Sequence, residues 1–343
     1  MAPQLNKVTI AERFEVNIDK ILGKGGFGEV FRACDVVVVP PLAVAAKRGS
    51  PESLRIEALM LEKVGAHPSI IGLHHYVELS GSVAWMFISL VSGGELFDRL
   101  IDSGNLSEGA TRPIARNIAS ALAHCLSKGI VHRDVKLENV MLCAEDPNAL
   151  KLIDFGLAVS LPLSADGSVA PTLLHDNVGS KSWKAPELFF AKEGYHAPPV
   201  DAWAYGVLVF SLLSGFFPFD EARTTDWRFS RLAQDQSKGI GPCDSIFRMY
   251  DRACPFSLKC KDFVDGLLAI DPGKRTPLPL CLEHSWLQAP PPATMAAVDG
   301  VVYRSSGRFG WDCGEEPLAM PLPEGAPRLT RQAAAIEAPP DAQ

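Results

Sequence analysis

The sequence from His132 to Asn139 reads HRDVKLEN, and a second motif, Asp154-Phe155-Gly156, begins fifteen residues after that Asn. The first motif contains the carboxylate of Asp134 and the amide of Asn139, and the second adds the carboxylate of Asp154. Carboxylate and amide oxygens can bind Mg²⁺, and a carboxylate can also accept a proton from a reacting group. A fold that uses the three groups together must place both motifs on neighbouring loops.

A glycine-rich run, GKGGFGEV, lies near the start of the chain and contains Gly23, Gly25 and Gly28 at G-x-G-x-x-G spacing. Dinucleotide-binding domains use the same spacing, but there a helix follows the glycines. This chain continues as EVFRACDVVVV, whose β-branched and aromatic residues favour a strand. The glycines are therefore predicted at a hairpin tip, where backbone N–H groups can approach phosphate oxygens. An ordinary hairpin turn is the alternative.

In their order along the chain, these motifs resemble those of eukaryotic-type protein kinases. The stretch Val44-Ala45-Ala46-Lys47 resembles the V-A-I-K strand of that family, with Ala46 in place of Ile. The resemblance extends from about Phe14 to Leu287 and includes three later matches: Ala185-Pro186-Glu187, Asp201-x-Trp203-x-x-Gly206 and Asp271-Pro272-x-Lys274-Arg275. In the family, the Glu of the first match pairs with the Arg of the last, which implies a buried Glu187–Arg275 salt bridge.

The resemblance implies an α+β, two-lobed fold. A small β-rich lobe with one helix is expected over residues 14–89, and a larger, mainly helical lobe over 92–287. In the second lobe, residues 114–126 have the apolar periodicity of a helix, although Pro113 blurs where it starts. Residues 288–343 are rich in Pro, Gly and Ala, so we expect a disordered or loosely attached tail. Within it, the island VVYRSSGRFGWD could dock on a lobe or remain a solvated linker.

Catalytic roles follow from the resemblance residue by residue. Asp134 would receive the proton of the acceptor hydroxyl, while Asn139 and Asp154 would hold Mg²⁺. Lys136 stands where Ser/Thr kinases have the lysine that neutralises the γ-phosphate, which implies serine or threonine acceptors. Lys47 would contact the α and β phosphates of ATP. The alternative for a lysine at the end of an apolar strand is simply a solvated end.

In the family, a helix glutamate holds this lysine, and two candidates are present. Residues 51–64 form a predicted helix, with Ser50 as its N-cap and Pro51 in its first turn. Glu57 is the first choice as partner of Lys47, although the separation is shorter than kinases usually have, and Glu62 is the alternative. The short connection is also the one feature that favours a non-catalytic pseudokinase, an ATP-binding scaffold, over an active enzyme.

The resemblance also places an ATP pocket. Ile88 would be its gatekeeper, beside the hinge at residues 89–91, and apolar walls with a few polar groups suit a flat heterocycle. The same apolar residues would be core residues in either case. The complete set expected to bind the cofactor is Leu22, Gly23, Lys24, Gly25, Gly26, Gly28, Val30, Ala45, Lys47, Glu57, Ile88, Glu95 and Met141.

Two further features bear on substrates. The segments SGGELFDRL and LEHSWL resemble the calcium/calmodulin-dependent and checkpoint-type kinase group, although no calcium-binding EF-hand loop is present. Glu95 and Glu138 match positions that face basic substrate residues in basophilic kinases, which predicts protein substrates with Arg or Lys upstream of the acceptor. A solvated surface charge is the alternative for each.

The activation segment, residues 157–184, has an acidic residue where kinases usually carry a phosphorylated one. Asp176 occupies that position, three residues before Gly179. Arg133, directly before Asp134, is the residue that commonly binds the phosphate. Asp176 could therefore order the segment without phosphorylation. Alternatively, Asp176 is a solvated loop residue and Thr172 or another hydroxyl is the phosphorylated site.

Composition indicates which partners this protein has and in which cellular compartment it is found. The net charge of −7 argues against nucleic acid as a partner. The 8 cysteines form no C-x-x-C pair, so we expect reduced thiols in a cytoplasmic or nuclear protein. No signal peptide or myristoylation site is visible at the start. The apolar run 202–219 follows Asp201 directly and is expected to be a buried helix, not a membrane span. We expect a monomer without membrane attachment.

Overall fold

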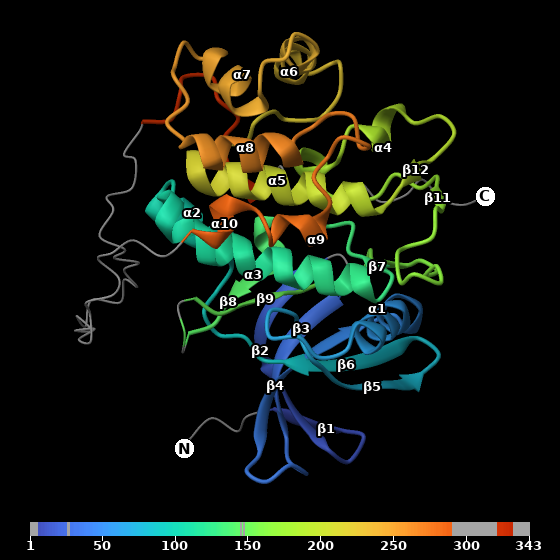
Figure 1. Cartoon of the computed structure of the whole chain (residues 1–343). Coiled ribbons are helices and arrows are strands. Elements are labelled where there is room, and N and C mark those ends of the chain that lie inside the picture. Colours follow the sequence, from blue (N-terminus) through green and yellow to red (C-terminus); the bar gives the residue numbers. More distant parts are fainter. Residues whose placement is uncertain (1–5, 26–27, 145, 147, 290–320, 332–343) are drawn as a thin grey trace.

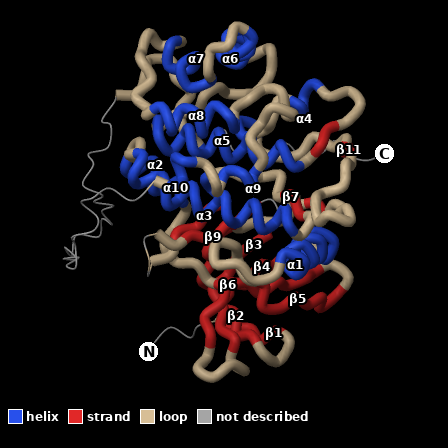
Figure 2. The backbone as a smooth tube through the Cα atoms, viewed as in Figure 1, coloured by secondary structure: helices blue, strands red, loops and turns tan. Residues whose placement is uncertain are grey.

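The computed structural model describes residues 6–25, 28–144, 146, 148–289 and 321–331. The long strands gather in one lobe with a single helix, and the other helices form a second lobe together with several short strands (Figures 1 and 2). The predicted α+β, two-lobed architecture is confirmed.

The small lobe is built on a six-stranded antiparallel sheet with strand order β1-β2-β3-β4-β6-β5. Its buried face contains Phe14, which stacks on Phe87 with ring centroids 3.7 Å apart. The first strand lies before Phe14, so this sheet begins seven residues earlier than the boundary predicted at 14. The strands are β1 (Lys7–Ile10), β2 (Phe14–Gly25), β3 (Gly28–Asp35), β4 (Leu42–Gly49), β5 (Leu73–Ser80) and β6 (Val83–Ser89).

The glycine-rich run forms the predicted hairpin between β2 and β3. Gly25 and Gly28 face each other across the last register position, and residues 26–27 lie outside the described residues. Gly28 has φ +132°, and a Cβ there would lie 2.0 Å from the carbonyl oxygen of Arg48. Only glycine fits this approach of two strands.

One helix, α1 (Pro51–Val64), packs against the sheet, as predicted for this lobe. The side chain of Ser50 accepts a hydrogen bond from the N–H of Ser53, and Pro51 occupies the first turn, so the predicted N-cap is confirmed. The helix buries Leu54 and Leu61 together with the carboxylate of Glu57. The position of α1 therefore depends on apolar packing and on a positively charged partner for the Glu57 carboxylate.

The large lobe is organised around α5 (Pro198–Ser214), which is buried along nearly its whole length. The apolar run that begins at residue 202 is therefore a central helix. Among the described residues, none of the helices combines the length and the apolar character that a membrane span requires. Around it lie α2 (Leu96–Ser103), α3 (Glu108–Ser127), α4 (Glu187–Phe190), α6 (Trp227–Ser237), α7 (Pro242–Arg248), α8 (Leu258–Leu267), α9 (Leu278–Cys281) and α10 (Ser285–Gln288).

Short strands and turns between α3 and α5 connect the motifs. The hairpin of β8 and β9 links the HRD loop to the DFG loop, and Ile70 from the small lobe bridges to Leu152 of β9. These elements are β7 (Ile130–Val131), the 3₁₀ turn η1 (Leu137–Asn139), β8 (Val140–Leu142), β9 (Leu150–Leu152), β10 (Val159–Ser160), β11 (Leu173–Leu174), η2 (Lys181–Trp183) and β12 (Tyr195–His196).

Residues 321–331, which we call the strap, pack along the large lobe (red in Figure 1). The N–H of Phe217 donates to the carbonyl of Pro327 at 3.0 Å, and Leu329 is buried with 8% exposure. This part of the tail is attached to the large lobe, because Leu329 packs into an apolar core that composition does not reveal. The rest of the tail, including the island at 301–312, lies outside the described residues.

A buried ion pair ties the start of α4, just after the activation segment, to the loop that follows α8. Arg275 donates to both carboxylate oxygens of Glu187 at 2.6 and 3.1 Å and to the carbonyl of Pro199 at 2.6 Å. The Arg275 side chain is fully buried and lies over the ring of Trp203. The salt bridge predicted between residues 187 and 275 is confirmed.

Removing one member of this pair should destabilise the protein strongly. Arg275→Met leaves the Glu187 carboxylate buried without its partner, which typically costs about 3–5 kcal/mol. Urea unfolding followed by circular dichroism measures the change. Arg55→Met is a matched control, because Arg55 also binds a glutamate, Glu78, through two hydrogen bonds but is largely exposed. Equal losses for the two variants would contradict the prediction.

Candidate active site

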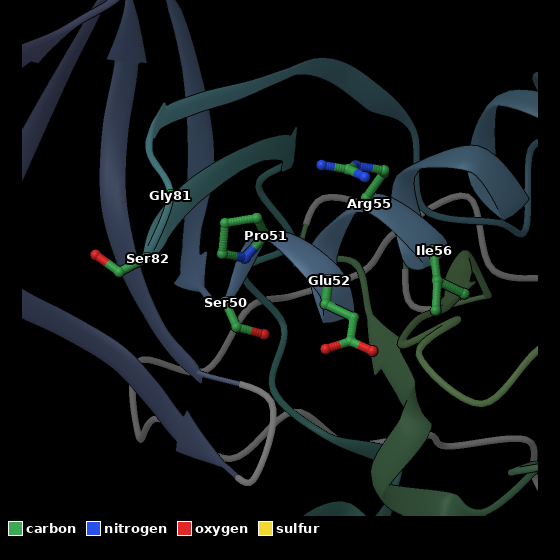
Figure 3. A pocket seen from close by; sticks show the side chains of 7 residues that line it. All are labelled: Ser50, Pro51, Glu52, Arg55, Ile56, Gly81 and Ser82. Carbon is green, nitrogen blue, oxygen red and sulfur yellow. The ribbon is translucent and has the colours of Figure 1, made fainter.

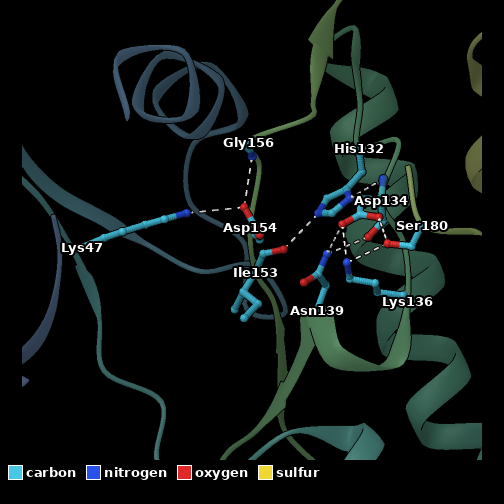
Figure 4. Close-up of polar contacts among 9 residues, drawn as sticks. All are labelled: Lys47, His132, Asp134, Lys136, Asn139, Ile153, Asp154, Gly156 and Ser180. Carbon is cyan, nitrogen blue, oxygen red and sulfur yellow. Dashed lines mark hydrogen bonds and ion pairs between the residues drawn. The ribbon is translucent and has the colours of Figure 1, made fainter. Parts of the chain in front are cut away.

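The carboxylate of Asp134 is the centre of a buried network of polar contacts (Figure 4). Lys136 Nζ lies 2.7 Å from Oδ2, and the Ser180 hydroxyl donates to Oδ1 at 2.8 Å. Lys136 also donates to Ser180 at 2.8 Å, and the side chain of Asn139 donates to the Asp134 carbonyl and to Oδ2. Three side chains thus fix the orientation of one carboxylate.

The loop that presents Asp134 is held by a second buried carboxylate, Asp201, near the start of α5. Asp201 accepts the N–H groups of His132 at 2.7 Å and of Arg133 at 2.8 Å. Arg133 has φ +63°, a conformation that a non-glycine residue adopts at a cost. Burial raises the pKa of Asp201, and the two N–H donors work against that shift. The two hydrogen bonds to Asp201 offset the free-energy cost of the strained backbone at Arg133.

Lys47, Glu57 and Asp154 meet where the two lobes face each other. Lys47 Nζ lies 2.7 Å from Glu57 Oε2 and 3.5 Å from Asp154 Oδ1. Burial lowers the pKa of Lys47, but attraction to the two carboxylates outweighs it and the net shift is upward. The lysine is therefore charged at neutral pH, and it links β4, α1 and the DFG loop.

The short connection between Lys47 and its partner does not prevent the pair. Strand β4 ends at Gly49 and α1 begins at Pro51, so the helix starts almost at once and still carries Glu57 to the lysine. Glu62, the alternative partner, is exposed.

The residues proposed to hold Mg²⁺ have the donor atoms that this ion prefers. Asp154 provides a carboxylate, and the amide oxygen of Asn139 turns away from Asp134 in Figure 4. Across the described part of the chain, no cluster of three or more His, Cys, Asp or Glu side chains could hold a metal by itself. Mg²⁺ usually takes one or two protein oxygens and completes its shell with substrate phosphates and water. The donor set fits an ion that arrives with a nucleotide.

The residues predicted to surround ATP are brought together by strand pairing. Val30 pairs with Gly23 and with Lys47, and Ala45 pairs with Ile88. Across the hinge, Glu95 and Met141 form a bridge, which places them at the large-lobe side of the same region. Of the remaining residues, Leu22 is half exposed, Lys24 is paired with Glu29 on the surface, and Gly26 lies outside the described residues.

Beside the Asp134 network lie two more carboxylates. The oxygens of Glu138 are shielded from solvent and have no hydrogen-bond partner on any other described residue. Burial raises its pKa to about 7, although Lys136 opposes this. Burial also raises the pKa of Glu95, which Arg331 of the strap counteracts. A buried carboxylate without a partner is a site for a cation.

Arg133 reaches from the HRD loop to the activation segment. Its guanidinium lies 2.5 Å from Asp176 Oδ2 and donates to the carbonyl of Leu157. The Tyr195 hydroxyl donates to the other oxygen of Asp176 at 3.0 Å. Asp176 is therefore not a free loop carboxylate, because it has two partners from distant parts of the sequence.

Sequence reasoning missed three residues of this site. Ser180 directly follows Gly179 but was assigned no role, and Asp201 was noted only as part of a longer motif. Arg331 carried no signal, because its contacts join residues more than 230 positions apart. By contrast, a cavity of about 450 Å³ between the start of α1 and the β5–β6 turn contains none of the predicted site residues (Figure 3).

Comparisons with known proteins agree with this geometry. A model of the protein kinase domain matches residues 16–287. Serine/threonine-protein kinase RAD53 of Saccharomyces cerevisiae is 32% identical over 83% of this chain, and calcium/calmodulin-dependent protein kinase type IV of Mus musculus is 32% identical over 82%. CBL-interacting protein kinase 9 of Oryza sativa is 29% identical over 91%.

The matches cover only part of these relatives, namely 34% of the yeast protein, 56% of the mouse protein and 64% of the rice protein. Within this chain, however, the matched domain includes both lobes and every motif around Asp134. The chain belongs to the protein kinase family.

Proposed function

We propose that this chain transfers the γ-phosphoryl group of ATP, with Mg²⁺, to serine or threonine hydroxyls of proteins. The observation that supports this most is the Asp134 carboxylate, which is buried and fixed by Lys136, Ser180 and Asn139. A fixed carboxylate orients an incoming hydroxyl and accepts its proton, and positioning of this kind is a main source of rate in phosphoryl transfer.

The other residues act on the phosphates. Mg²⁺ supplies positive charge that neutralises the transferring group, and Asn139 and Asp154 would hold it. Lys47, kept charged by Glu57 and Asp154, would bind the α and β phosphates. Lys136, beside Asp134, would neutralise the γ-phosphate near a short acceptor side chain.

The alternative, a pseudokinase that binds ATP as a scaffold, was suggested by the short connection after Lys47. That support is removed, because Lys47 and Glu57 lie 2.7 Å apart. We therefore favour an active enzyme.

For substrates we infer a preference for arginine or lysine upstream of the acceptor. Glu138 is the main reason, since its shielded carboxylate lacks a hydrogen-bond partner on other described residues and adjoins the Asp134 network. A guanidinium group could donate two hydrogen bonds to it. Binding a cation would also favour the ionised carboxylate and offset the effect of burial.

For activation we infer that Asp176 takes the place of a phosphorylated residue. Arg133 and Tyr195 both bind its carboxylate and connect the activation segment to the HRD loop and to β12. A carboxylate carries one charge where a phosphate carries up to two, so the contact should be more sensitive to salt.

Replacing the carboxylate of Asp134 should remove most turnover. Asp134→Asn keeps the shape of the side chain but cannot accept the proton, and general-base catalysis is typically worth about 10²–10⁴-fold in rate. Steady-state transfer to a serine peptide measures the loss, and titration with a fluorescent ATP analogue should show that nucleotide binding survives. Turnover close to that of the wild type would refute the role of Asp134.

Neutralising Glu138 should weaken binding of basic peptides selectively. Glu138→Gln preserves size but removes the charge, so the KM for a peptide with an upstream arginine should rise roughly tenfold, as for loss of a charged hydrogen bond. The same peptide with alanine in place of arginine is the control. If the KM values of both peptides change equally, Glu138 does not read the basic residue.

Unphosphorylated protein should already be active, and the contact of Asp176 should be the reason. Protein made without other kinases and verified as unphosphorylated by mass spectrometry should phosphorylate a peptide, and Asp176→Ala should lower kcat by about tenfold or more. Asp166→Ala is the matched control, because Asp166 lies in the same segment and its side chain binds Ser168 alone among the described residues. An enzyme that is inert until Thr172 or a neighbour is phosphorylated would show that the inference is wrong.

A further inference from the structure

Several contacts hold the strap on the large lobe along its length, ahead of its last described residue, which lies beside Glu95. Arg252 donates to the carbonyl of Pro321 at 2.5 Å, and Arg228 donates to the carbonyl of Gly325 at 2.6 Å. Beyond these, a backbone bridge joins Phe216 to Arg328, and Leu329 is buried. The strap therefore has a fixed register, which determines where its last described residue lies.

That residue, Arg331, binds two carboxylates at the start of α2. One guanidinium nitrogen lies 2.6 Å from Asp98 Oδ1 and 3.2 Å from Glu95 Oε2. The guanidinium also lies over the ring of Phe97, 5.5 Å from its centre. Two negative charges and an aromatic face form a site for a guanidinium group, and here a group from the same chain occupies it.

The arrangement divides the acidic surface into two subsites. The first, formed by Glu95 and Asp98, is occupied by Arg331. The second is Glu138, whose oxygens bind no other described residue. The hydrogen bonds and ion pairs of the described strap reach the first subsite but not Asp134, Lys136 or Ser180.

We infer that Arg331 is a specificity-determining residue of this kinase. By neutralising Glu95 and Asp98, it removes one of two positions at which a basic substrate residue could bind, and it leaves recognition to Glu138. The inference rests on the proposed preference for basic substrates. The role of the strap would then be to restrict the position, relative to the acceptor, at which a substrate arginine can bind.

The test compares substrate profiles of full-length variants. A serine peptide is prepared in a series with a single arginine moved through the positions upstream of the acceptor, and kcat/KM is expressed relative to the arginine-free peptide. Wild-type protein should favour one position. Arg331→Ala should add a second favoured position, with its relative kcat/KM raised roughly two- to fivefold, because the uncovered carboxylates are partly exposed.

Two further variants make the test specific. Arg328→Ala is the matched control, because it removes the same charge from the same strap at an exposed side chain, and it should keep the wild-type profile. Adding Asp98→Asn to Arg331→Ala should abolish the new preference, since it removes a carboxylate of the uncovered subsite.

An unchanged profile in Arg331→Ala overturns the inference. A rise by the same factor for every peptide also overturns it, because the strap would then obstruct the whole site instead of one subsite. Absence of transfer to any peptide by wild-type protein would refute the proposed function itself. Transfer to the arginine-free peptide separates these cases, because it shows that catalysis is intact when only the subsite assignment fails.

Discussion

The hydrogen bonds that the buried carboxylate of Asp201 accepts from His132 and Arg133 are the interaction on which the site depends. They hold the backbone of Arg133 at φ +63°, and the strained turn points neighbouring side chains in different directions. Asp134 faces Ser180 and Lys136, and Arg133 itself reaches Asp176. The carboxylate proposed to be catalytic and the Arg133–Asp176 contact proposed to activate the protein thus depend on the same two hydrogen bonds, and disorder in the HRD loop would affect both.

A second constraint connects the lobes. Lys47 is charged because two carboxylates compensate its burial, and those carboxylates belong to α1 and to the DFG loop. If α1 moved away, Glu57 and Lys47 would each lose a buried partner, which is costly. The position of α1 is therefore coupled to the proposed phosphate-binding lysine by electrostatics. The cavity of about 450 Å³ beside the start of α1 lies outside this contact.

What could be predicted from the sequence was local. The hairpin at Gly28, the N-cap at Ser50 and the paired motifs around Asp134 and Asp154 are short patterns whose physical requirements can be read residue by residue. Long-range partners could not be read from such patterns, and the Glu187–Arg275 salt bridge was predicted only through the family resemblance. Helix α3 begins at Glu108, six residues before the expected segment, because Ser107 caps it and the helix continues through Pro113. The docking of the strap depends on a surface formed by distant residues, which composition does not encode.

The most direct test of the account is to identify which residue the unmodified protein phosphorylates. Full-length protein, made without other kinases, is incubated with γ-labelled ATP, Mg²⁺ and a basic peptide that contains serine, threonine and tyrosine, and the modified residue is located by mass spectrometry. The account predicts label on serine or threonine, and none when Mg²⁺ is chelated. A peptide that remains unlabelled while the protein measurably binds ATP would contradict it, because the fixed Asp134 carboxylate would then serve no catalytic purpose.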